Sequence, residues 1–316
     1  MTRFVDYIDQ VFGPEEGKLH GYPGHEIIEM ALLRLYEMEP DPKYLRLARY
    51  FIEERGKQPC FFAEEARRQG REYPWKDSPF RFGYYQAAAP VREQKDAVGH
   101  AVRAVYLYSG MADAARLTGD DSLYQACRTL WDSVTQKRMY LTGAIGSSAY
   151  GESFTMDYDL PPDLVYGETC ASVGLAFFAR RMLRMDPDGR YADVLEKVLY
   201  NGILSGMSLD GTKFFYVNPL EAYPERNRKV QELRHAKTRR QAWFACACCP
   251  PNLARLMESV GDYIYMEREG QLFVHLYIGS RAELKQAAED TRVEMESRYP
   301  WKGDPCLQVE SGSDWE

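Results

Sequence analysis

Three of the seven cysteines stand within four positions of one another, at Cys246, Cys248 and Cys249. Adjacent cysteines such as Cys248 and Cys249 form a disulfide only with strain, because neighbouring Cα atoms lie about 3.8 Å apart, closer than relaxed disulfide geometry requires. Thiolates are preferred zinc ligands, so two thiols side by side favour a metal site. Glu168 and Cys170 offer two more donors in a second segment. We therefore expect these two residues and the adjacent cysteine pair to bind one zinc ion.

Both segments must depart from regular helix if they are to share an ion. Pro250 disfavours helical geometry at Cys249, and Pro251 suits the first position of the helix that follows. The positive end of that helix would favour thiolate over thiol. Glu168 and Cys170 face the same side only in extended geometry, because two positions of a regular helix differ by about 200°. We therefore expect irregular backbone at both segments.

Each of these residues also has a simpler explanation. Buried free cysteines commonly act as small apolar side chains, and Glu168 could be a first-turn helix residue favoured by the helix dipole, with Cys170 buried. Glu152 follows Gly151 in a glycine-rich loop, where it is either solvated or a general acid/base. His100 lies in a segment predicted as an otherwise apolar helix, where a core histidine is the alternative to a pocket residue.

Composition limits the classes of partner. The 316 residues are 45% apolar, enough for a large core in one or two domains, and the net charge is −7. Without a long Lys/Arg run, the chain is expected to bind neither nucleic acid nor anionic membranes, but small molecules or neutral polymers. It also lacks an apolar run of membrane-spanning length and an N-terminal signal peptide. Together with bunched, odd-numbered cysteines, this predicts a reducing, cytoplasmic location.

Helical hairpins are predicted at three places. Apolar residues repeat at helical spacing on both sides of short turns, and these turns are too short to join anything but antiparallel neighbours. The turns are Pro40–Pro42, Thr118–Asp121 and Pro187–Gly189. We expect the helices that contain Tyr44, Tyr124 and Tyr191 to be equivalent members of one layer of an α/α toroid.

Strand-like patterns appear in the last third of the chain. Lys213–Leu220 reads as a strand, and the charged stretch 225–240 reads as a mobile excursion. Apolar and polar residues then alternate from Gln271 to Ile278, and Arg292–Glu296 and Cys306–Glu310 continue the pattern. We expect a β region that begins near Gln271.

An ordered series of short motifs resembles glycoside hydrolase family 127, the zinc-containing β-L-arabinofuranosidases. The motifs run through nearly the whole chain, and Glu-Thr-Cys together with Cys-Cys-Pro-Pro-Asn is the most specific pair. The motifs are Tyr22–Glu26, Val98–His100, Thr142–Gly146, Gly151–Glu152, Leu160–Pro162, Gly167–Ser172, Leu199–Gly202, Tyr216–Leu220 and Cys248–Asn252.

The resemblance implies a retaining glycosidase that removes terminal arabinofuranose from an oligosaccharide or other glycoside. It assigns Cys248 as the zinc-bound nucleophile, in place of the usual carboxylate, and Glu152 as the acid/base. By the same resemblance the zinc ligands are Glu168, Cys170, Cys248 and Cys249. The residues implied to line the sugar pocket are His25, His100, Glu196 and Tyr216.

The fold implied by the resemblance is mainly α: an (α/α)6 barrel followed by β-sandwich domains. The chain supplies too few helices for six hairpins, and the resemblance begins inside the barrel and stops inside the sandwich. We therefore expect a fragment, with a partial barrel over residues 1–267 and the start of a β-sandwich over residues 268–316. A homodimer formed through the sandwich region is expected of the full-length protein.

Two other classes of function share some of these features. A different α/α-toroid enzyme, such as a sugar epimerase or an unsaturated-uronide hydrolase, would use histidines or carboxylates and leave the cysteines incidental. A non-catalytic, zinc-stabilised helical binding module would have a closed metal site. Stoichiometric zinc counts against the first class, and hydrolysis of a β-L-arabinofuranoside counts against the second.

Overall fold

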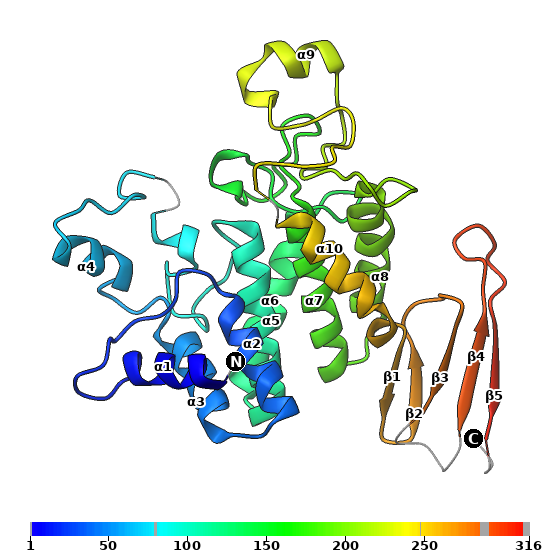
Figure 1. The fold of residues 1–316 in the computed structure, drawn as a ribbon, viewed down its shortest axis with the longest axis horizontal. Helices are drawn as coiled ribbons and strands as arrows, with labels where there is room; N and C mark the ends of the chain where they lie inside the picture. Colours follow the sequence, from blue (N-terminus) through cyan, green and yellow to red (C-terminus); the bar gives the residue numbers. More distant parts are fainter. Residues whose placement is uncertain (1, 79–80, 247, 285–290, 312–316) are drawn as a thin grey trace.

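The computed structural model describes residues 2–78, 81–246, 248–284 and 291–311. Helices occupy most of the chain and short strands follow them (Figure 1). The α-helices are α1 (Thr2–Val11), α2 (Ile27–Met38), α3 (Pro42–Glu54), α4 (Phe61–Arg68), α5 (Ala101–Thr118), α6 (Asp121–Lys137), α7 (Thr169–Met185), α8 (Gly189–Lys197), α9 (Pro224–Lys229) and α10 (Cys249–Glu258). The shorter helical turns are η1 (Arg81–Tyr85), η2 (Tyr150–Glu152), η3 (Val198–Ile203), η4 (Leu204–Gly206), η5 (Gln231–Leu233) and η6 (Val260–Tyr263).

The three predicted hairpins are present as α2–α3, α5–α6 and α7–α8. An aspartate caps the second helix of each hairpin: Asp41, Asp120 and Asp188 accept hydrogen bonds from backbone N–H groups of the first turn. Such caps satisfy amides that have no partner within the helix. Local sequence therefore marks where each second helix begins.

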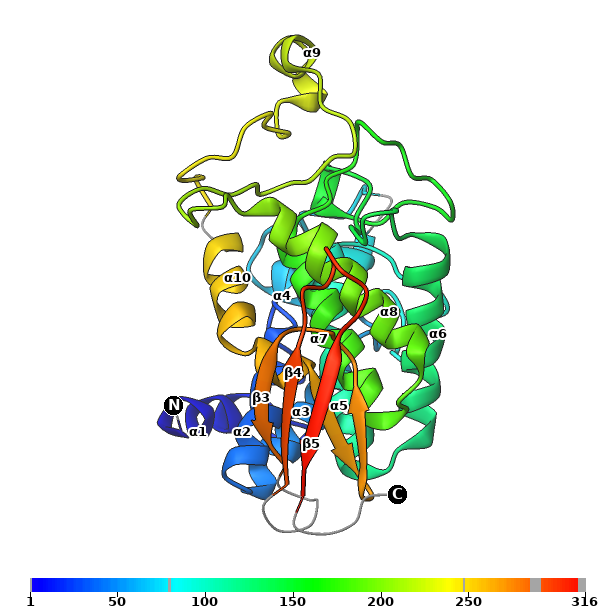
Figure 2. The ribbon, with the colours of Figure 1, turned by 90° about the vertical axis from the view of Figure 1, so that its right-hand side faces the viewer.

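The first helices of the hairpins form an inner layer and the second helices an outer one. α5 packs between α2 and α7, and α10 packs against α7 (Figure 1). α6 and α8 lie outside α5 and α7 (Figure 2), and α3 packs mainly against α2, so the predicted layer of Tyr44, Tyr124 and Tyr191 helices is confirmed. Gly174 lets α7 approach α5 closely, because a Cβ there would lie 2.5 Å from Val105 Cγ2. The mainly α, incomplete toroid matches the expected fold class.

The core lies between these layers. α5 is buried almost all round, as expected of a central helix, and apart from Arg103 only its C-terminal turn reaches solvent. Between α6, α7 and α8, the Trp131 ring meets the rings of Phe178 and Tyr191 at centroid distances of 5.4 and 4.9 Å. Within the described part of the chain, no helix combines the length and the apolar character that a membrane span requires.

Two small antiparallel sheets follow the helices. Strands β1 (Tyr265–Arg268) and β2 (Gln271–Val274) form a hairpin, and β3 (Ser280–Glu283), β4 (Arg292–Glu296) and β5 (Cys306–Glu310) form a second sheet in that order. The last two strands lie where the sequence predicts them. The first strand begins at Tyr265, earlier than expected, and the predicted strand Gln271–Ile278 ends at Val274. The division at residues 267 and 268 stays a prediction.

The turn between β1 and β2 explains the earlier start. Glu269 and Gly270 both have positive φ, 52° and 77°. This is the backbone of a two-residue hairpin loop whose twist matches that of its strands. The four residues of β1 alternate too briefly to stand out in the sequence.

Loops gather over one end of the inner helices, above the N-termini of α7 and α10 (Figure 1). The predicted strand Lys213–Leu220 is wrong: Phe214 makes isolated bridges with Met207 and Gln241, and Val217 makes one with Glu168. The charged stretch 225–240 contains most of α9 and all of η5, and it projects from the helical body in Figure 1. Its mobility stays a prediction.

Candidate metal centre and active site

Three thiols and one carboxylate converge between the N-termini of α7 and α10. One ligand atom each from Glu168, Cys170, Cys248 and Cys249 lies within 4.8 Å of the others. Cys248 Sγ is 3.3 Å from Glu168 Oε1 and 3.9 Å from Cys249 Sγ, and Cys249 Sγ is 3.5 Å from Cys170 Sγ. The structure thus brings together residues about 80 positions apart, as the sequence predicts for this cluster.

The two helix starts aim these side chains at one point, but the irregular backbone expected at both occurs only at the start of α7, because Cys248 has helical angles, φ −75° and ψ −37°. Glu168 is the N-cap of α7 with extended geometry, φ −62° and ψ 136°, so it and Cys170 avoid the opposed directions of a regular helix. α10 begins at Cys249, two residues before Pro251, with Cys248 as its N-cap. The expectation that Cys249 lies outside the helix is therefore wrong. Prolines fit this first turn because its amides have no helical acceptor.

The cluster stabilises negative charge on one sulfur. The thiols of Cys170 and then Cys249 hold the pKa of the Cys248 thiol well below its usual range, whereas the pKa values of Cys170 and Cys249 are raised. Burial raises the pKa of Glu168 well above its usual range, and the Glu152 charge adds to this. Four groups that can become anionic thus share one buried site. A bound divalent cation would offset their repulsion and favour ionisation of all four.

The donor set fits a tetrahedral metal ion. A zinc ion with Zn–S bonds of ~2.3 Å holds two sulfurs about 3.8 Å apart, close to the 3.5 and 3.9 Å that separate Cys249 Sγ from the sulfurs of Cys170 and Cys248. Glu168 Oε2 is buried and has no hydrogen-bond partner among the described residues. An orphaned buried carboxylate oxygen is costly unless a cation or another donor meets it. The four side chains can therefore hold a metal ion.

Glu152 and His100 stand beside this cluster. His100 caps α5, and its Nδ1 accepts a hydrogen bond from the Val102 amide, so a neutral ring carries its proton on Nε2. That Nε2 lies 2.9 Å from Glu152 Oε2, and the Tyr166 hydroxyl donates to Glu152 Oε1 at 3.1 Å. His100 is thus at the helix start, not within an apolar helix as predicted.

The acid/base candidate is held in strained backbone. Glu152 has φ 49°, a left-handed value uncommon for a residue other than glycine, and Gly151 before it has φ 67°. Bridges of Ser153 with His100 and Ser148 fix the loop around them. Although burial raises the pKa of Glu152, the hydrogen bonds from His100 and Tyr166 bring it below its ordinary value. His100, Glu152 and Glu168 also lie close enough to share an ion. The set with three cysteines provides softer ligands than this second set, and such ligands are the ones that select zinc.

One cavity of about 580 Å³ is lined by Glu152, His100, Glu168, Cys170 and Cys248. The Tyr216 hydroxyl lies 2.9 Å from Cys248 Sγ, and the His25 ring lies 5.7 Å from the Tyr106 ring. Although part of His25 is exposed, desolvation lowers its pKa to about 4, and Arg103 adds to the effect, so the imidazole is neutral at pH 7. The pocket therefore offers a thiolate, a carboxyl group and neutral hydrogen-bonding side chains.

A slightly larger cavity of about 620 Å³ lies elsewhere, beside the α5–α6 turn and the β1–β2 hairpin. Its charged lining residues include Asp120, Arg184 and Arg268, and neither a cysteine nor a histidine contributes to it. Size therefore does not identify the site here. The cysteine, histidine and glutamate side chains of the smaller cavity identify it as the candidate site.

Comparison with known proteins decides the family. The model of the β-L-arabinofuranosidase GH127 catalytic domain matches residues 1–262. The chain belongs to the GH127 family. The resemblance seen in the sequence motifs is thereby confirmed.

The GH127 relatives are longer than this chain. It is 47% identical over 304 residues to a non-reducing end β-L-arabinofuranosidase of Bifidobacterium longum subsp. longum, covering 95% of this chain and 46% of that protein. A crystal structure of a GH127 β-L-arabinofuranosidase from Geobacillus stearothermophilus T6 has a TM-score of 0.95 at 53% identity, covering 99% of this chain and 49% of that one. Another GH127 β-arabinofuranosidase structure has a TM-score of 0.85 at 40% identity, covering 98% of this chain and 44% of that one. The chain spans less than half of each.

One residue expected in the GH127 sugar pocket lies elsewhere. Glu196 is on the outer helix α8, where its Oε1 accepts a hydrogen bond from the Tyr299 hydroxyl at 2.7 Å. It does not line the cavity that His25, His100 and Tyr216 line. An outer helix turns its polar face away from the inner layer, so Glu196 instead ties α8 to the segment between β4 and β5.

Three hydrogen-bonding residues that line the pocket of this GH127 chain were not predicted from the sequence. Asn252 Nδ2 and Arg255 Nη2 donate to the Tyr106 hydroxyl at 2.6 and 2.9 Å, joining α10 to α5 across the cavity. Asn252 belongs to the Cys-Cys-Pro-Pro-Asn motif, which could have identified it. Tyr106 and Arg255 lie in ordinary helical patterns, which carry no signal of a pocket.

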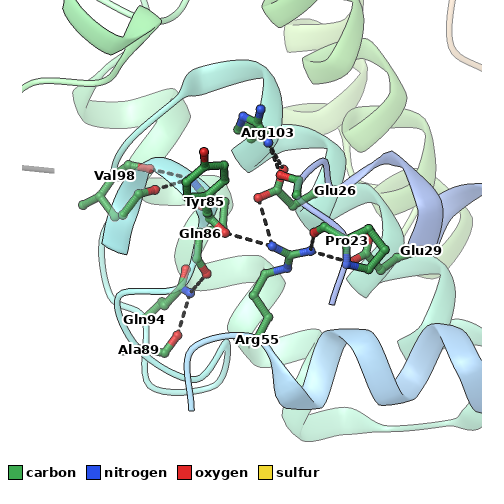
Figure 3. Close-up of polar contacts among 12 residues, drawn as sticks. Pro23, Glu26, Glu29, Arg55, Tyr85, Gln86, Ala89, Gln94, Val98 and Arg103 are labelled. Atoms are coloured by element: carbon green, nitrogen blue, oxygen red, sulfur yellow. Dashed lines mark hydrogen bonds and ion pairs between the residues drawn. The ribbon is translucent and has the colours of Figure 1, made fainter. Parts of the chain in front are cut away.

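A buried ionic network supports the loop that carries His25 (Figure 3). The fully buried Arg55 guanidinium donates to Glu26 Oε1 at 3.2 Å and Glu29 Oε1 at 3.0 Å, and also to the carbonyls of Pro23 and Tyr85. Arg103 reaches Glu26 and the Gly24 carbonyl from α5. Burial raises the pKa of Glu26 to about 7, although both arginines oppose this. Arg55 thus joins the loop that carries His25 to α2 and to η1.

Replacing Arg55 with methionine is expected to lower the free energy of unfolding by about 3–5 kcal/mol, because buried carboxyl groups would lose their partner. Arg46→Met is the control, since its exposed pair with Asp9 contributes about 0.2–1 kcal/mol. Urea unfolding of the whole polypeptide that contains this chain, followed by circular dichroism, measures both. Equal losses for the two variants would contradict the central role of Arg55.

Proposed function

We propose that the protein containing this chain is a retaining glycoside hydrolase that releases terminal β-L-arabinofuranose. The single observation that supports this most strongly is the Cys248 sulfur in the pocket wall, within the same cavity as the hydrogen-bonded Glu152 carboxyl group. The relatives named as β-L-arabinofuranosidases suggest the sugar. A sulfur nucleophile and a carboxylic acid/base together supply what a retaining double displacement requires.

In the first half of the reaction, the Cys248 sulfur attacks the anomeric carbon and the glycosidic C–O bond breaks. Glu152, whose pKa the hydrogen bonds from His100 and Tyr166 lower in the free pocket, must be protonated at that moment, and it gives its proton to the departing oxygen. In the second half, Glu152 takes a proton from water as the water oxygen attacks the same carbon, and the C–S bond breaks to restore the thiolate. Two displacements at one carbon preserve its configuration.

Other pocket residues hold the reacting groups in place. A thiolate cannot donate, so the Tyr216 hydroxyl donates to Cys248 Sγ and orients it. His100 and Tyr166 hold the two carboxylate oxygens of Glu152. Neutral His25, beside Tyr106, can donate to or accept from sugar hydroxyls.

We propose zinc as the metal, held by Glu168, Cys170, Cys248 and Cys249. Three sulfurs and one oxygen suit zinc better than magnesium or calcium, which take mainly oxygen ligands. When bound, zinc keeps the Cys248 sulfur deprotonated at neutral pH. Such free thiols suit a reducing compartment such as the cytoplasm. Neither the epimerase-like enzyme nor the binding module is favoured, because neither needs an ionised thiol facing a pocket.

The test is hydrolysis of an aryl β-L-arabinofuranoside by the whole polypeptide, with the product configuration followed by NMR. Glu152→Gln should lower kcat/KM on the methyl glycoside by about 10²–10⁴-fold, because methanol leaves poorly without a proton. On a dinitrophenyl glycoside, whose leaving group needs no proton, the loss in the first step should be much smaller.

Glu93→Gln, at an exposed position, is the control and should keep both activities. Equal loss of activity by Glu152→Gln on both glycosides would remove Glu152 as the acid. Inverted product would overturn the retaining mechanism.

A further inference from the structure

A local excess of positive charge marks residues 224–240, which we call the basic excursion. It contains seven lysines and arginines but only two glutamates, whereas the whole chain has a net charge of −7. The excursion projects from the end of the helical body where the loops gather (Figures 1 and 2). A basic surface on an otherwise acidic protein attracts anionic partners to that one place.

Three of these cations line one hollow on the excursion. Arg228, Arg234 and Lys237 border a space of about 280 Å³, and no Asp or Glu of the described residues lines it. All three side chains are exposed, and none forms an ion pair with a described carboxylate. Instead, Arg228 Nε donates to the Pro224 carbonyl and Lys237 Nζ to the Arg234 carbonyl, each at 3.2 Å. Like charges without a counter-ion repel one another, so a bound anion would relieve that repulsion.

The shape of the hollow is fixed by internal hydrogen bonds. The Asn227 side chain is buried, and its Oδ1 accepts from the Tyr223 amide at 2.9 Å while its Nδ2 donates to the Ala236 carbonyl at 3.3 Å. Arg226 pairs with Asp163 at 2.6 Å and so ties the excursion to the loop before α7. A site that already has its bound shape loses less freedom when a ligand arrives.

One ring contact joins the excursion to the candidate acid/base. The His235 ring lies 5.5 Å from the Tyr166 ring, and the Tyr166 hydroxyl donates to Glu152 Oε1. His235 follows Arg234, which lines the hollow, whereas Glu152 lines the pocket. The hollow therefore lies outside the pocket cavity but at the same end of the molecule. A polymer that reaches both must combine carbohydrate for the pocket with negative charge for the hollow.

We propose that the basic excursion is a docking surface for an acidic glycan, whose uronate carboxylates are bound by Arg228, Arg234 and Lys237. Guanidinium groups match the planar carboxylate with two parallel hydrogen bonds. The proposal rests on the proposed function, which makes the partner a carbohydrate, and extends it: the best substrates are arabinofuranosides attached to chains that contain uronic acids. The contact lies outside the cavity, so it affects the affinity for the polymer and not the bond-breaking steps.

The test is the binding of polygalacturonate, a simple uronic acid polymer, to the whole polypeptide that contains this chain, measured by isothermal titration calorimetry. The wild type should bind polygalacturonate and not the neutral polymer dextran. Its affinity should fall as salt is added, because the screening length shortens from about 10 Å at 0.1 M to about 3 Å at 1 M. A triple variant with Arg228→Gln, Arg234→Gln and Lys237→Gln should bind about tenfold more weakly, since three exposed charge pairs are lost.

The matched control is a triple variant with Arg49→Gln, Arg68→Gln and Arg298→Gln. These exposed arginines lie on α3, on α4 and after β4, so their loss changes the net charge equally but leaves the excursion intact. The control should bind polygalacturonate as the wild type does. Equal weakening in both triple variants, or none in the excursion variant, would overturn the docking surface. Equally tight binding of single-stranded DNA would overturn its assignment to a glycan.

Two further readouts keep the result independent of folding and of catalysis. Hydrolysis of a small aryl β-L-arabinofuranoside should be unchanged in the excursion variant, which shows that its pocket is folded. Salt-independent binding, or no binding, of polygalacturonate by the wild type would overturn the surface without any variant. If the wild type cleaves the aryl glycoside but does not bind the polymer, only the docking surface fails. If it binds the polymer but does not cleave the glycoside, it is the proposed function that fails.

Discussion

Cys248→Ser is expected to lower kcat/KM on a β-L-arabinofuranoside by on the order of 10⁴–10⁶-fold, the range seen when an enzyme loses its covalent nucleophile. A serine hydroxyl stays protonated where the Cys248 thiol, surrounded by Cys170 and Cys249, ionises readily. Steady-state rates of the whole polypeptide measure the loss. Cys306→Ser, at an exposed cysteine on β5, is the control and should retain full activity.

Mass spectrometry distinguishes the nucleophile from a metal ligand. An arabinofuranose-configured electrophile should label Cys248, and the label should be absent from the Cys248→Ser variant. Cys249 should remain unlabelled, because it is buried and its raised pKa keeps it a poor nucleophile without the metal. A label on Glu152 or Glu168 would instead indicate an ordinary pair of carboxylates.

The helical part of the fold was predictable because its signals are local. Helical spacing and capping aspartates such as Asp41 and Asp120 depend only on near neighbours, so the hairpins and their layer could be inferred. The strand predicted over Lys213–Leu220 failed for the opposite reason. Its apolar residues pair one at a time with Met207, Gln241 and Glu168, and these partners come from distant segments that no local pattern reveals.

The site was predictable where residue chemistry is unusual. Adjacent thiols have few ordinary structural roles, so Cys248 and Cys249 indicate a metal site without any knowledge of the fold. Glu196 shows the limit: a glutamate on a helix looks the same whether it faces the pocket or, as here, Tyr299. Tyr106 shows the converse, because only the packing of α5 and α10 against α7 places its hydroxyl among pocket residues.

Metal content provides the most direct test of the cluster. The whole polypeptide, purified without chelator, should contain about one zinc per chain. Cys170→Ser should weaken metal binding more than the 10–100-fold typical of losing an outer partner, because a direct ligand is removed. Elemental analysis after dialysis measures this, and the activity should fall with the zinc content.

Cys127→Ser is the matched control for that experiment. Cys127 is as buried as Cys249, but it lies between α5 and α6, where its thiol faces the Tyr108 carbonyl. Its pKa is raised by burial, as expected of a thiol that packs and does not ionise. Its substitution can cost stability but should leave the zinc content at about one per chain. If Cys170→Ser retains its zinc, or if both variants lose it equally, the four residues at the starts of α7 and α10 do not form the metal site, because only a ligand should affect the ion independently of the fold.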